Sequence, residues 1–264
     1  MVLLPFMVAP DASATDVCAA PKIQDRRSLF DLADVRLGQC AFKDIQDLDH
    51  DYLLTLEPDR LLSWFRREAG LYAKAPAYPF WESEDVWGGG PLAGQILGFY
   101  LSSSTTGDES IREKLEYTLG ELDECITAGG DGYLLATING RHLFSDVVAG
   151  KIETYNATIN GVWEPVYIMN KMMLGLYQTY RRLDLPMAKS ILVRMEDWFG
   201  HEVLDRLSYE QIQQLLVCEH GSINESYIDV YSITGDKRYY EWAKLLNDED
   251  MLLPATEGRD ILNG

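Results

Sequence analysis

Apolar residues recur at helical spacing along most of the chain. After Asp108, for example, one stripe is formed by Ile111, Leu115, Leu119 and Leu122. Residues three or four positions apart lie on the same face of a helix, so this stripe predicts an amphipathic helix with a buried apolar face. Read in the same way, the sequence predicts about nine helices. They are expected at 42–56, 58–67, from Pro91 onward, after Asp108, from Trp163 onward, and at 186–199, 209–217, 223–233 and 239–246.

The turns between these helices share a signature. Thr106-Gly107-Asp108 and Thr234-Gly235-Asp236 each close one helix-like run and open the next. Glycine suits the left-handed residue that ends a helix, and aspartate can cap the N–H groups of the following one. Leu183-Asp184-Leu185-Pro186 marks a third turn of this kind, because proline is suited to the first helical position. Helical hairpins in series predict an all-α bundle, solenoid or closed toroid, and the toroid would favour a carbohydrate site in a central cleft.

Two segments interrupt the helical pattern. The loop over residues 78–90 is rich in aromatic residues, proline and glycine, a composition typical of functional loops. Later, Gly129-Gly130-Asp131-Gly132 is followed by residues 133–137, which read as a short strand, and by the turn signal Asn139-Gly140. We therefore expect a small β-hairpin to project near residue 139.

Composition narrows the classes of function. The chain has 264 residues, 47% of them hydrophobic, and a formal net charge of -19. Nucleic acid is excluded as a partner because a polyanion would be repelled by this surface and no local run of Lys or Arg compensates. A membrane span is excluded because no apolar run approaches the ~20 residues that it needs. The expected partner is a glycan or another small molecule.

The N-terminal residues 1–30 read as a leader or an irregular segment, followed by one helical domain over residues 31–264. Val2 to Ala9 is apolar and is followed by Ala12-Ser13-Ala14, as in a secretory signal, yet the usual positive start is missing. A secreted or periplasmic location and a cytoplasmic one both stay open. The four cysteines, Cys18, Cys40, Cys125 and Cys218, show no metal-ligand spacing, so no metal site is expected from this chain alone.

Three groups of residues are candidates for chemistry on a sugar. Glu219 and Glu225 flank a helix start, with Asn224 beside them, and two carboxylates are what ordinary glycoside hydrolysis needs. The alternative for this pair is a helix cap and a solvated glutamate.

The other two groups would bind rather than react. Trp81 and Glu82 could stack on a sugar and hydrogen-bond it, or could simply pin their loop. Tyr167 and Asn170 stand three positions apart and are expected to face one cavity.

The order of these segments resembles the catalytic domain of β-L-arabinofuranosidase-type glycoside hydrolases over roughly residues 33–264. The matching stretches are 34–37, 52–54, 58–62, 65–66, 69–71, 81–82, 97–102, 132–134, 163–167 with Lys171, 219–225, 230–236 and 258–260. The resemblance implies an (α/α)6 toroid with additional β-domains. It also implies a pocket that includes Gln95, Tyr167, Asn170 and the 219–225 stretch.

The sequence departs from the family pattern at residues that would line the sugar pocket. Gln95, Phe99 and Asn170 stand where the resemblance leads one to expect histidines. Glutamine and asparagine can hydrogen-bond a hydroxyl, but they cannot carry a proton at neutral pH as histidine can.

The resemblance places further motifs after the last matched stretch. These are a His-Ala-Asn-Thr motif, a general acid/base glutamate and a zinc-bound cysteine nucleophile, and the 264-residue sequence does not contain them. We therefore expect either a fragment or a truncated relative, in which about nine helices form an incomplete ring. Its exposed apolar flank would be covered by self-association, by a partner, or by the C-terminal segment folding back over it.

Two functions follow from this comparison. One is a carbohydrate-active domain that uses zinc only if the later region is present. The other is a non-hydrolytic relative, which binds glycan or carries out acid/base chemistry on another small molecule.

Overall fold

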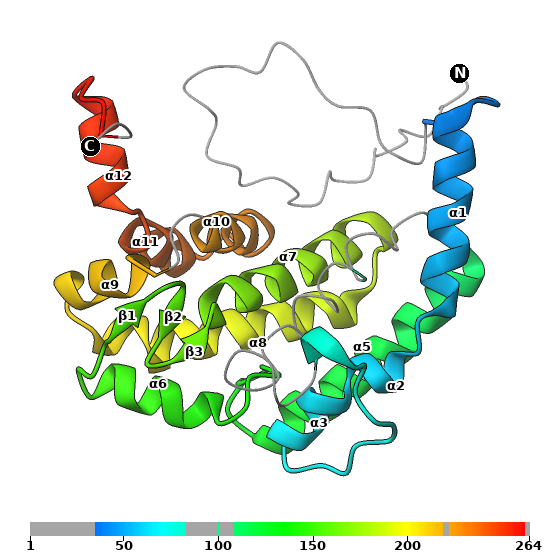
Figure 1. Cartoon of the computed structure of the whole chain (residues 1–264), viewed down its shortest axis with the longest axis horizontal. Coiled ribbons are helices and arrows are strands. Elements are labelled where there is room, and N and C mark those ends of the chain that lie inside the picture. The colour runs from blue at the N-terminus through cyan, green and yellow to red at the C-terminus, as the bar shows by residue number, and fades with distance from the viewer. Residues whose placement is uncertain (1–34, 83–99, 101–107, 219–221, 262–264) are drawn as a thin grey trace, which may run out of the picture.

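A computed structural model of the chain describes residues 35–82, 100, 108–218 and 222–261, except for the side chains of Trp81 and Met251. The described part consists of helices, with one small sheet (Figure 1). The expectations for residues 1–30, for the helix from Pro91 and for Thr106-Gly107 lie outside the described residues.

The first helical segments follow the sequence closely. Helix α1 spans Ala41–Thr55, α2 spans Pro58–Leu61, α3 spans Ser63–Glu68, and the 3-10 turn η2 spans Phe80–Glu82. Pro58 occupies the first turn of α2, where its missing N–H costs nothing. Gly70 adopts a φ of 74° just after α3, and this left-handed conformation ends the helix.

Helix α5 (Glu109–Gly129) confirms the stripe that begins after Asp108. The Asp108 carboxylate accepts hydrogen bonds from the N–H groups of Ser110 and Ile111, and Gly130 ends the helix with a φ of 82°. The predicted strand over residues 133–137 and the hairpin at Asn139-Gly140 are wrong. Asn139 is left-handed, with a φ of 55°, but it precedes helix α6 (Gly140–Val148) instead of joining two strands.

The sheet lies later in the chain than predicted. Strands β1 (Thr154–Tyr155), β2 (Thr158–Ile159) and β3 (Val162–Trp163) pair antiparallel in the order β1-β2-β3. Thr154 pairs with Ile159, and Thr158 pairs with Trp163. The tight turns of this meander use left-handed residues, with Asn156, Ala157 and Asn160 at positive φ. Strand β3 ends at Trp163, just before the next long helix begins at Pro165.

The central hairpin is formed by α7 (Pro165–Leu183) and α8 (Pro186–Glu202), as the sequence predicts. The 3-10 turn η3 (Leu204–Arg206) and helix α9 (Tyr209–Leu216) follow, and Ser208 and Gln211 form a capping box at the start of α9. Helices α10 (Ile223–Thr234) and α11 (Lys237–Leu245) make the next hairpin, in which Gly235 is left-handed and Asp236 caps α11. The last helix, α12 (Glu249–Thr256), was not predicted.

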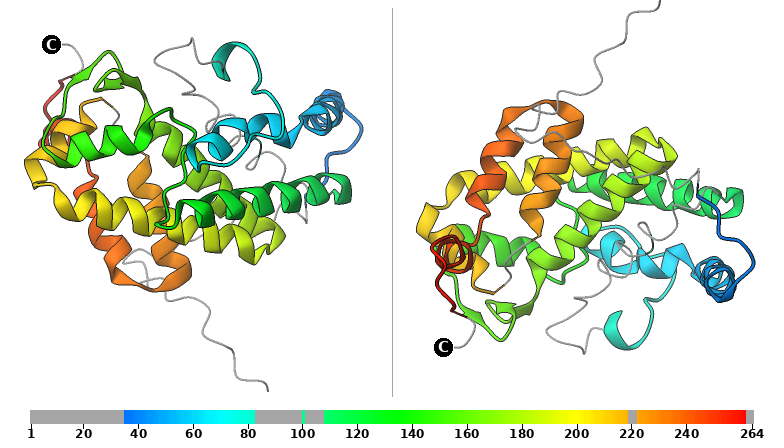
Figure 2. Two further views of the ribbon diagram at one scale, coloured as in Figure 1. Left: turned by 90° about the horizontal axis from the view of Figure 1, so that it is seen from below. Right: turned by 90° about the horizontal axis from the view of Figure 1, so that it is seen from above.

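Helix α8 lies at the centre of the packing, against α5, α7 and α10 (Figures 1 and 2). Trp198 on α8 stands edge-on to Tyr133, with ring centroids 4.9 Å apart, and to Phe144 of α6, at 5.5 Å. On the α10 side, Tyr227 meets Trp242 of α11 at 5.9 Å. Such aromatic pairs bury large apolar areas in defined orientations, so one core joins the hairpins.

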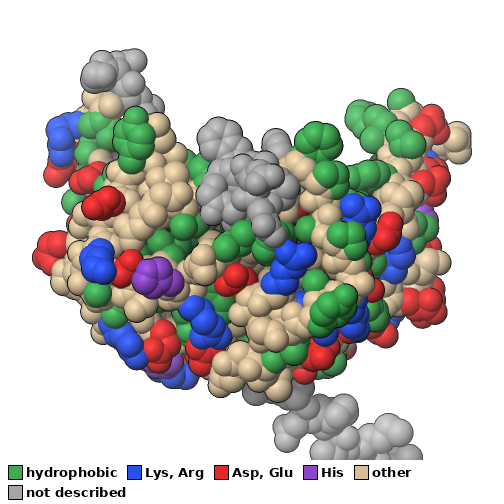
Figure 3. All heavy atoms as spheres, turned by 60° about the horizontal axis from the view of Figure 1, so that its bottom comes forward, with side chains coloured by type: hydrophobic (Ala, Val, Ile, Leu, Met, Phe, Trp, Pro, Cys, Tyr) green, Lys and Arg blue, Asp and Glu red, His purple; other side chains and the backbone are tan. Residues whose placement is uncertain are grey.

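Helix α1 presents an apolar face that the described residues leave open. Phe42, Ile45, Leu48 and Tyr52 are 60–74% exposed, whereas Leu53 is the helix's buried residue. Hydrophobic side chains gather at the upper right of Figure 3, where α1 stands out from the body. That self-association or a partner covers such a face stays a prediction. None of the described helices is both long enough and apolar enough to span a bilayer.

Glu196 of α8 is fully buried, and both carboxyl oxygens lack a hydrogen-bond partner among the described residues. Burial, together with the charges of Asp229 and Asp197, raises the pKa of Glu196 well above 4.5. The folded state therefore holds this proton more tightly than the unfolded chain. The protonated carboxyl of Glu196 therefore makes its full contribution to the free energy of unfolding below pH 4.5. This contribution is lost as the pH rises through the folded-state pKa.

Replacing Glu196 by methionine should stabilise the protein, by about 1–3 kcal/mol at neutral pH, because it removes an unsatisfied buried carboxyl. The gain should be larger at pH 8 than at pH 5, and urea unfolding across that range measures it. Glu113→Met, at an exposed position of α5, is the matched control and should change stability little. A Glu196→Met variant that is less stable than wild type at pH 8 would contradict this account.

Candidate functional site

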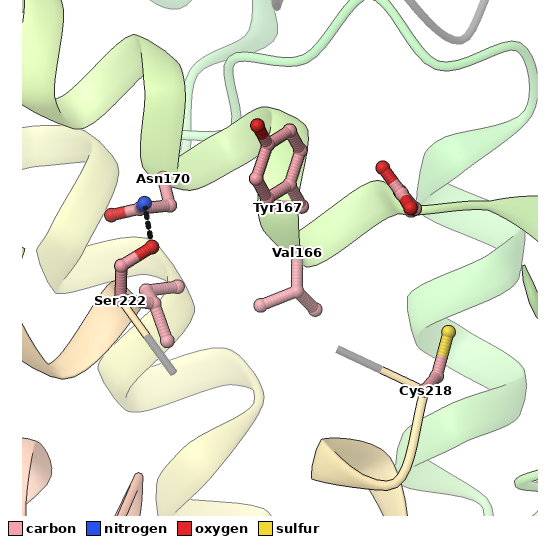
Figure 4. A pocket seen from close by; sticks show the side chains of 7 residues that line it. Val166, Tyr167, Asn170, Cys218 and Ser222 are labelled. Atoms are coloured by element: carbon pink, nitrogen blue, oxygen red, sulfur yellow. Dashed lines mark hydrogen bonds between the residues drawn. The ribbon is translucent and has the colours of Figure 1, made fainter. Parts of the chain in front are cut away.

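A cavity of about 190 Å³ lies between the N-terminal ends of α7 and α10 (Figure 4). The described part of its wall comprises seven residues from three segments: Glu164, Val166, Tyr167, Asn170, Cys218, Ser222 and Ile223. Pockets for drug-sized ligands run to about 300–1,000 Å³, so a space of this size suits one small ring rather than an extended chain.

Helix α7 contributes most of the wall. Pro165 starts the helix, and Tyr167 and Asn170 lie three positions apart on the face that meets the cavity. The Nζ of Lys171 lies 4.5 Å from the centroid of the Tyr167 ring. This cation–π contact holds one face of the ring in place and leaves the aromatic group at the cavity.

Asn170 connects α7 to α10. Its Nδ2 donates to Ser222 Oγ at 2.6 Å, the bond drawn in Figure 4, and Ser226 Oγ donates to Asn170 Oδ1 at 2.7 Å. The side chain is almost completely buried. Because an amide has two donor hydrogens and an acceptor oxygen with two lone pairs, each end of Asn170 keeps limited capacity for a ligand. Its first role in the structure is therefore to fix one helix start against the other.

Glu164 adds a carboxyl group to the wall. It precedes α7 with a φ of 42° and a ψ of 46°, a left-handed conformation that is uncommon outside glycine, asparagine and aspartate. Its side chain is half-buried, and burial raises the pKa of its carboxyl above the usual value. Neither a salt bridge nor a side-chain hydrogen bond joins Glu164 to another described residue.

Cys218 enters from the segment after α9, across the cavity from Asn170 and Ser222 (Figure 4). Cys218 and Ser222 are the described neighbours of residues 219–221, and both line the cavity. The stretch that carries Glu219 is thus bordered on each side by cavity residues, although Glu219 itself lies outside the described residues.

Asn224 and Glu225, which the sequence also predicts as site residues, are absent from the described wall of this cavity. Asn224 donates from Nδ2 to Asn247 Oδ1 at 3.1 Å, and its Oδ1 accepts from the Glu225 N–H. Glu225 is exposed. Their roles in catalysis and binding stay predictions, as do those of Gln95, which lies outside the described residues, and Trp81, of which only the backbone is described.

Glu82 is fully buried behind Trp64, whose Nε1 donates to the Glu82 carbonyl oxygen at 2.6 Å. Burial raises the pKa of Glu82 to about 8, so at neutral pH the carboxyl is mostly protonated. It is absent from the cavity wall, and its predicted contact with sugar stays a prediction.

Sequence reasoning missed Glu164, Ser222 and Ser226 as parts of this site. Glu164 lies in the motif over residues 163–167 and Ser222 in the motif over residues 219–225, so the family-like motifs included both residues without singling them out. Among the described residues, no three His, Cys, Asp or Glu side chains come close enough together to hold a metal ion. The expectation for cofactors, with zinc only in a later region, stays a prediction.

Comparison with known proteins places the chain in a family. The family described as β-L-arabinofuranosidase, GH127 catalytic domain, matches residues 34–264. The chain belongs to this GH127 family. The resemblance found in the sequence is thereby confirmed.

A solved relative supports the fold. It is the crystal structure of Ara127N-Se, a GH127 β-L-arabinofuranosidase from Geobacillus stearothermophilus T6. It matches with a TM-score of 0.53 and 12% sequence identity, over 86% of this chain and 35% of that one. The all-α, toroid-like fold predicted for the chain is confirmed, and the chain spans about a third of the relative's length. No curated protein matches the sequence.

The hydrogen bonds of Asn170 allow a graded test of the contact between α7 and α10. Ser226→Ala should destabilise the protein by about 1–3 kcal/mol, because it leaves the buried Asn170 oxygen without a donor. Ser222→Ala should destabilise the protein less than Ser226→Ala does, since Ser222 is only half-buried at the cavity edge. Thermal and urea unfolding of the two variants measures the difference, and equal stability of Ser226→Ala and wild type would contradict the bridging role.

Proposed function

We propose that this chain is a carbohydrate-active GH127 domain and that its cavity binds one furanose ring of an arabinose-containing glycan. The observation that carries the proposal is that two separate family-like motifs border the same cavity. Val166 and Tyr167 belong to the motif over residues 163–167, and Ser222 and Ile223 to the motif over residues 219–225.

The chemistry of the wall supports a sugar as ligand. The ring of Tyr167 offers an aromatic surface for the apolar face of a sugar, and Asn170 and Ser222 offer neutral hydrogen-bonding groups. Glu164 adds a carboxyl that can accept or donate a hydrogen bond according to its protonation. Trp81, Glu82, Gln95, Asn224 and Glu225 are kept as predicted contacts for glycan.

The second candidate, a non-hydrolytic glycan-binding relative, is favoured by Asn170. The resemblance places a histidine at this position, whereas the amide here cannot carry a proton and is held by two serines. Binding and hydrolysis therefore have to be measured separately.

The binding test uses methyl β-L-arabinofuranoside and calorimetry. The chain should bind this glycoside, and Tyr167→Ala should weaken the affinity by several-fold up to about ten-fold, because aromatic contacts are worth about 0.5–1.5 kcal/mol. Tyr155→Ala is the matched control, since Tyr155 is 75% exposed on β1 and lies outside the cavity wall. Absence of binding, or equal losses in the two variants, would contradict the sugar site.

The same preparation separates the two candidates by turnover of an aryl β-L-arabinofuranoside. The 264-residue polypeptide should show little or no hydrolysis, because the resemblance assigns the nucleophile to a motif that this sequence does not contain. Rapid turnover that a zinc chelator abolishes would contradict this expectation and favour the hydrolase.

A further inference from the structure

Glu164 is one of three described residues, with Phe80 and Ala157, that adopt a positive φ without being glycine, asparagine or aspartate, and it is the one of the three in the cavity wall. Asn139, Asn156, Asn160 and Asp184 are also left-handed, but asparagine and aspartate tolerate this region because their short polar side chains bond locally. Glu164 has no such compensation. It also precedes Pro165, and a residue before proline is normally pushed toward extended backbone.

The conformation of Glu164 is therefore held by its surroundings. Its N–H donates to the Ala157 carbonyl oxygen at 2.9 Å, and its own carbonyl accepts from the Ile168 N–H at 3.0 Å. These bonds tie the β-meander to the first turn of α7 through a single residue. Glycine would adopt the same backbone at lower cost, so stability alone does not explain a glutamate here.

The side chain shows what the glutamate contributes. It lines the cavity without an ion pair or a side-chain hydrogen bond to any other described residue. The other titratable groups in the described wall are Tyr167 from α7 and Cys218 from the segment after α9. Helix α10 contributes Ser222 and Ile223, which do not titrate, and Lys171 lies on the Tyr167 ring.

We propose that Glu164 hydrogen-bonds a hydroxyl of the bound sugar and that its protonation governs binding in the cavity. This inference rests on the proposed sugar site and deepens it. The left-handed backbone before α7 holds the residue in the wall, and the half-buried position keeps its carboxyl partly out of water. A carboxyl in this setting exchanges its proton at a higher pH than an exposed glutamate does, as its raised pKa indicates.

Two substitutions separate the chemistry of Glu164 from its backbone role. Glu164→Gln keeps the shape and removes the titration, so its affinity for methyl β-L-arabinofuranoside should not change from about pH 5 to about pH 8, whereas that of wild type should. Glu164→Gly removes the side chain, so it should weaken binding about ten-fold while the melting temperature stays the same or rises.

Matched controls are present in the same chain. Glu153→Gln changes an exposed carboxylate just before β1, outside the cavity wall, and should keep the wild-type pH profile. Asp184→Gly relaxes the left-handed cap at the other end of α7, where φ is 50°, and should leave binding unchanged.

Three outcomes would overturn the assignment. If Glu164→Gln keeps the pH profile of wild type, or if Glu164→Gly binds as wild type does, Glu164 has no role in binding while the sugar site stands. If wild type binds no glycoside at any pH, the sugar site itself fails, and the role of Glu164 fails with it.

Discussion

The carboxamide of Asn170 joins the start of α7 to the start of α10, and the cavity exists because these two helix ends are held together. Ser222 and Ser226 complete the contact from α10, one at the cavity edge and one in the buried interior. Without these partners, the desolvated amide would destabilise the folded state, because its buried donor and acceptor would be unsatisfied. The contact therefore fixes the spacing of the helices as well as stabilising them. Tyr167, Val166 and Ile223 reach the cavity wall as a consequence.

Glu196, Glu82 and Glu164 are carboxyl groups that the described part of the chain withdraws from water, each to a different extent. Glu196 is enclosed between helices, and Glu82 is enclosed behind Trp64. Glu164 alone among the three lines the cavity. Because an uncompensated buried charge is costly, the first two are held as neutral acids near neutral pH, whereas the half-buried Glu164 can exchange its proton with solvent. Glu164 differs from Glu82 and Glu196 in its position in the cavity wall and in its partial exposure to solvent.

The helical hairpins could be predicted from the sequence because their signals are local. Asp108 and Asp236 each cap a helix through their own near neighbours, and Gly235 needs only its own conformational freedom to end one. The misplaced hairpin shows the limit of such signals. Asn139 does adopt the left-handed conformation that Asn-Gly favours, but Gly140 packs where a Cβ would lie 2.1 Å from the Tyr133 hydroxyl. This tertiary contact belongs to a helix start, and no local pattern reports it.

The candidate site was predictable only in part for the same reason. Tyr167 and Asn170 share a helix face, which spacing shows, whereas Ser226 meets Asn170 across 56 positions of sequence. The backbone conformation of Glu164 depends on its bond to Ala157 in the β-meander, which the helical pattern does not reveal.

The central claim is that ligand binds where the start of α7 meets the start of α10. Amide hydrogen exchange with and without methyl β-L-arabinofuranoside tests it most directly, because it locates the bound ligand on the backbone. The account predicts slower exchange in residues 166–170 and 222–226, with the middle of α8 and α5 unchanged. Protection confined to other segments, or none at a saturating concentration of glycoside, would contradict it.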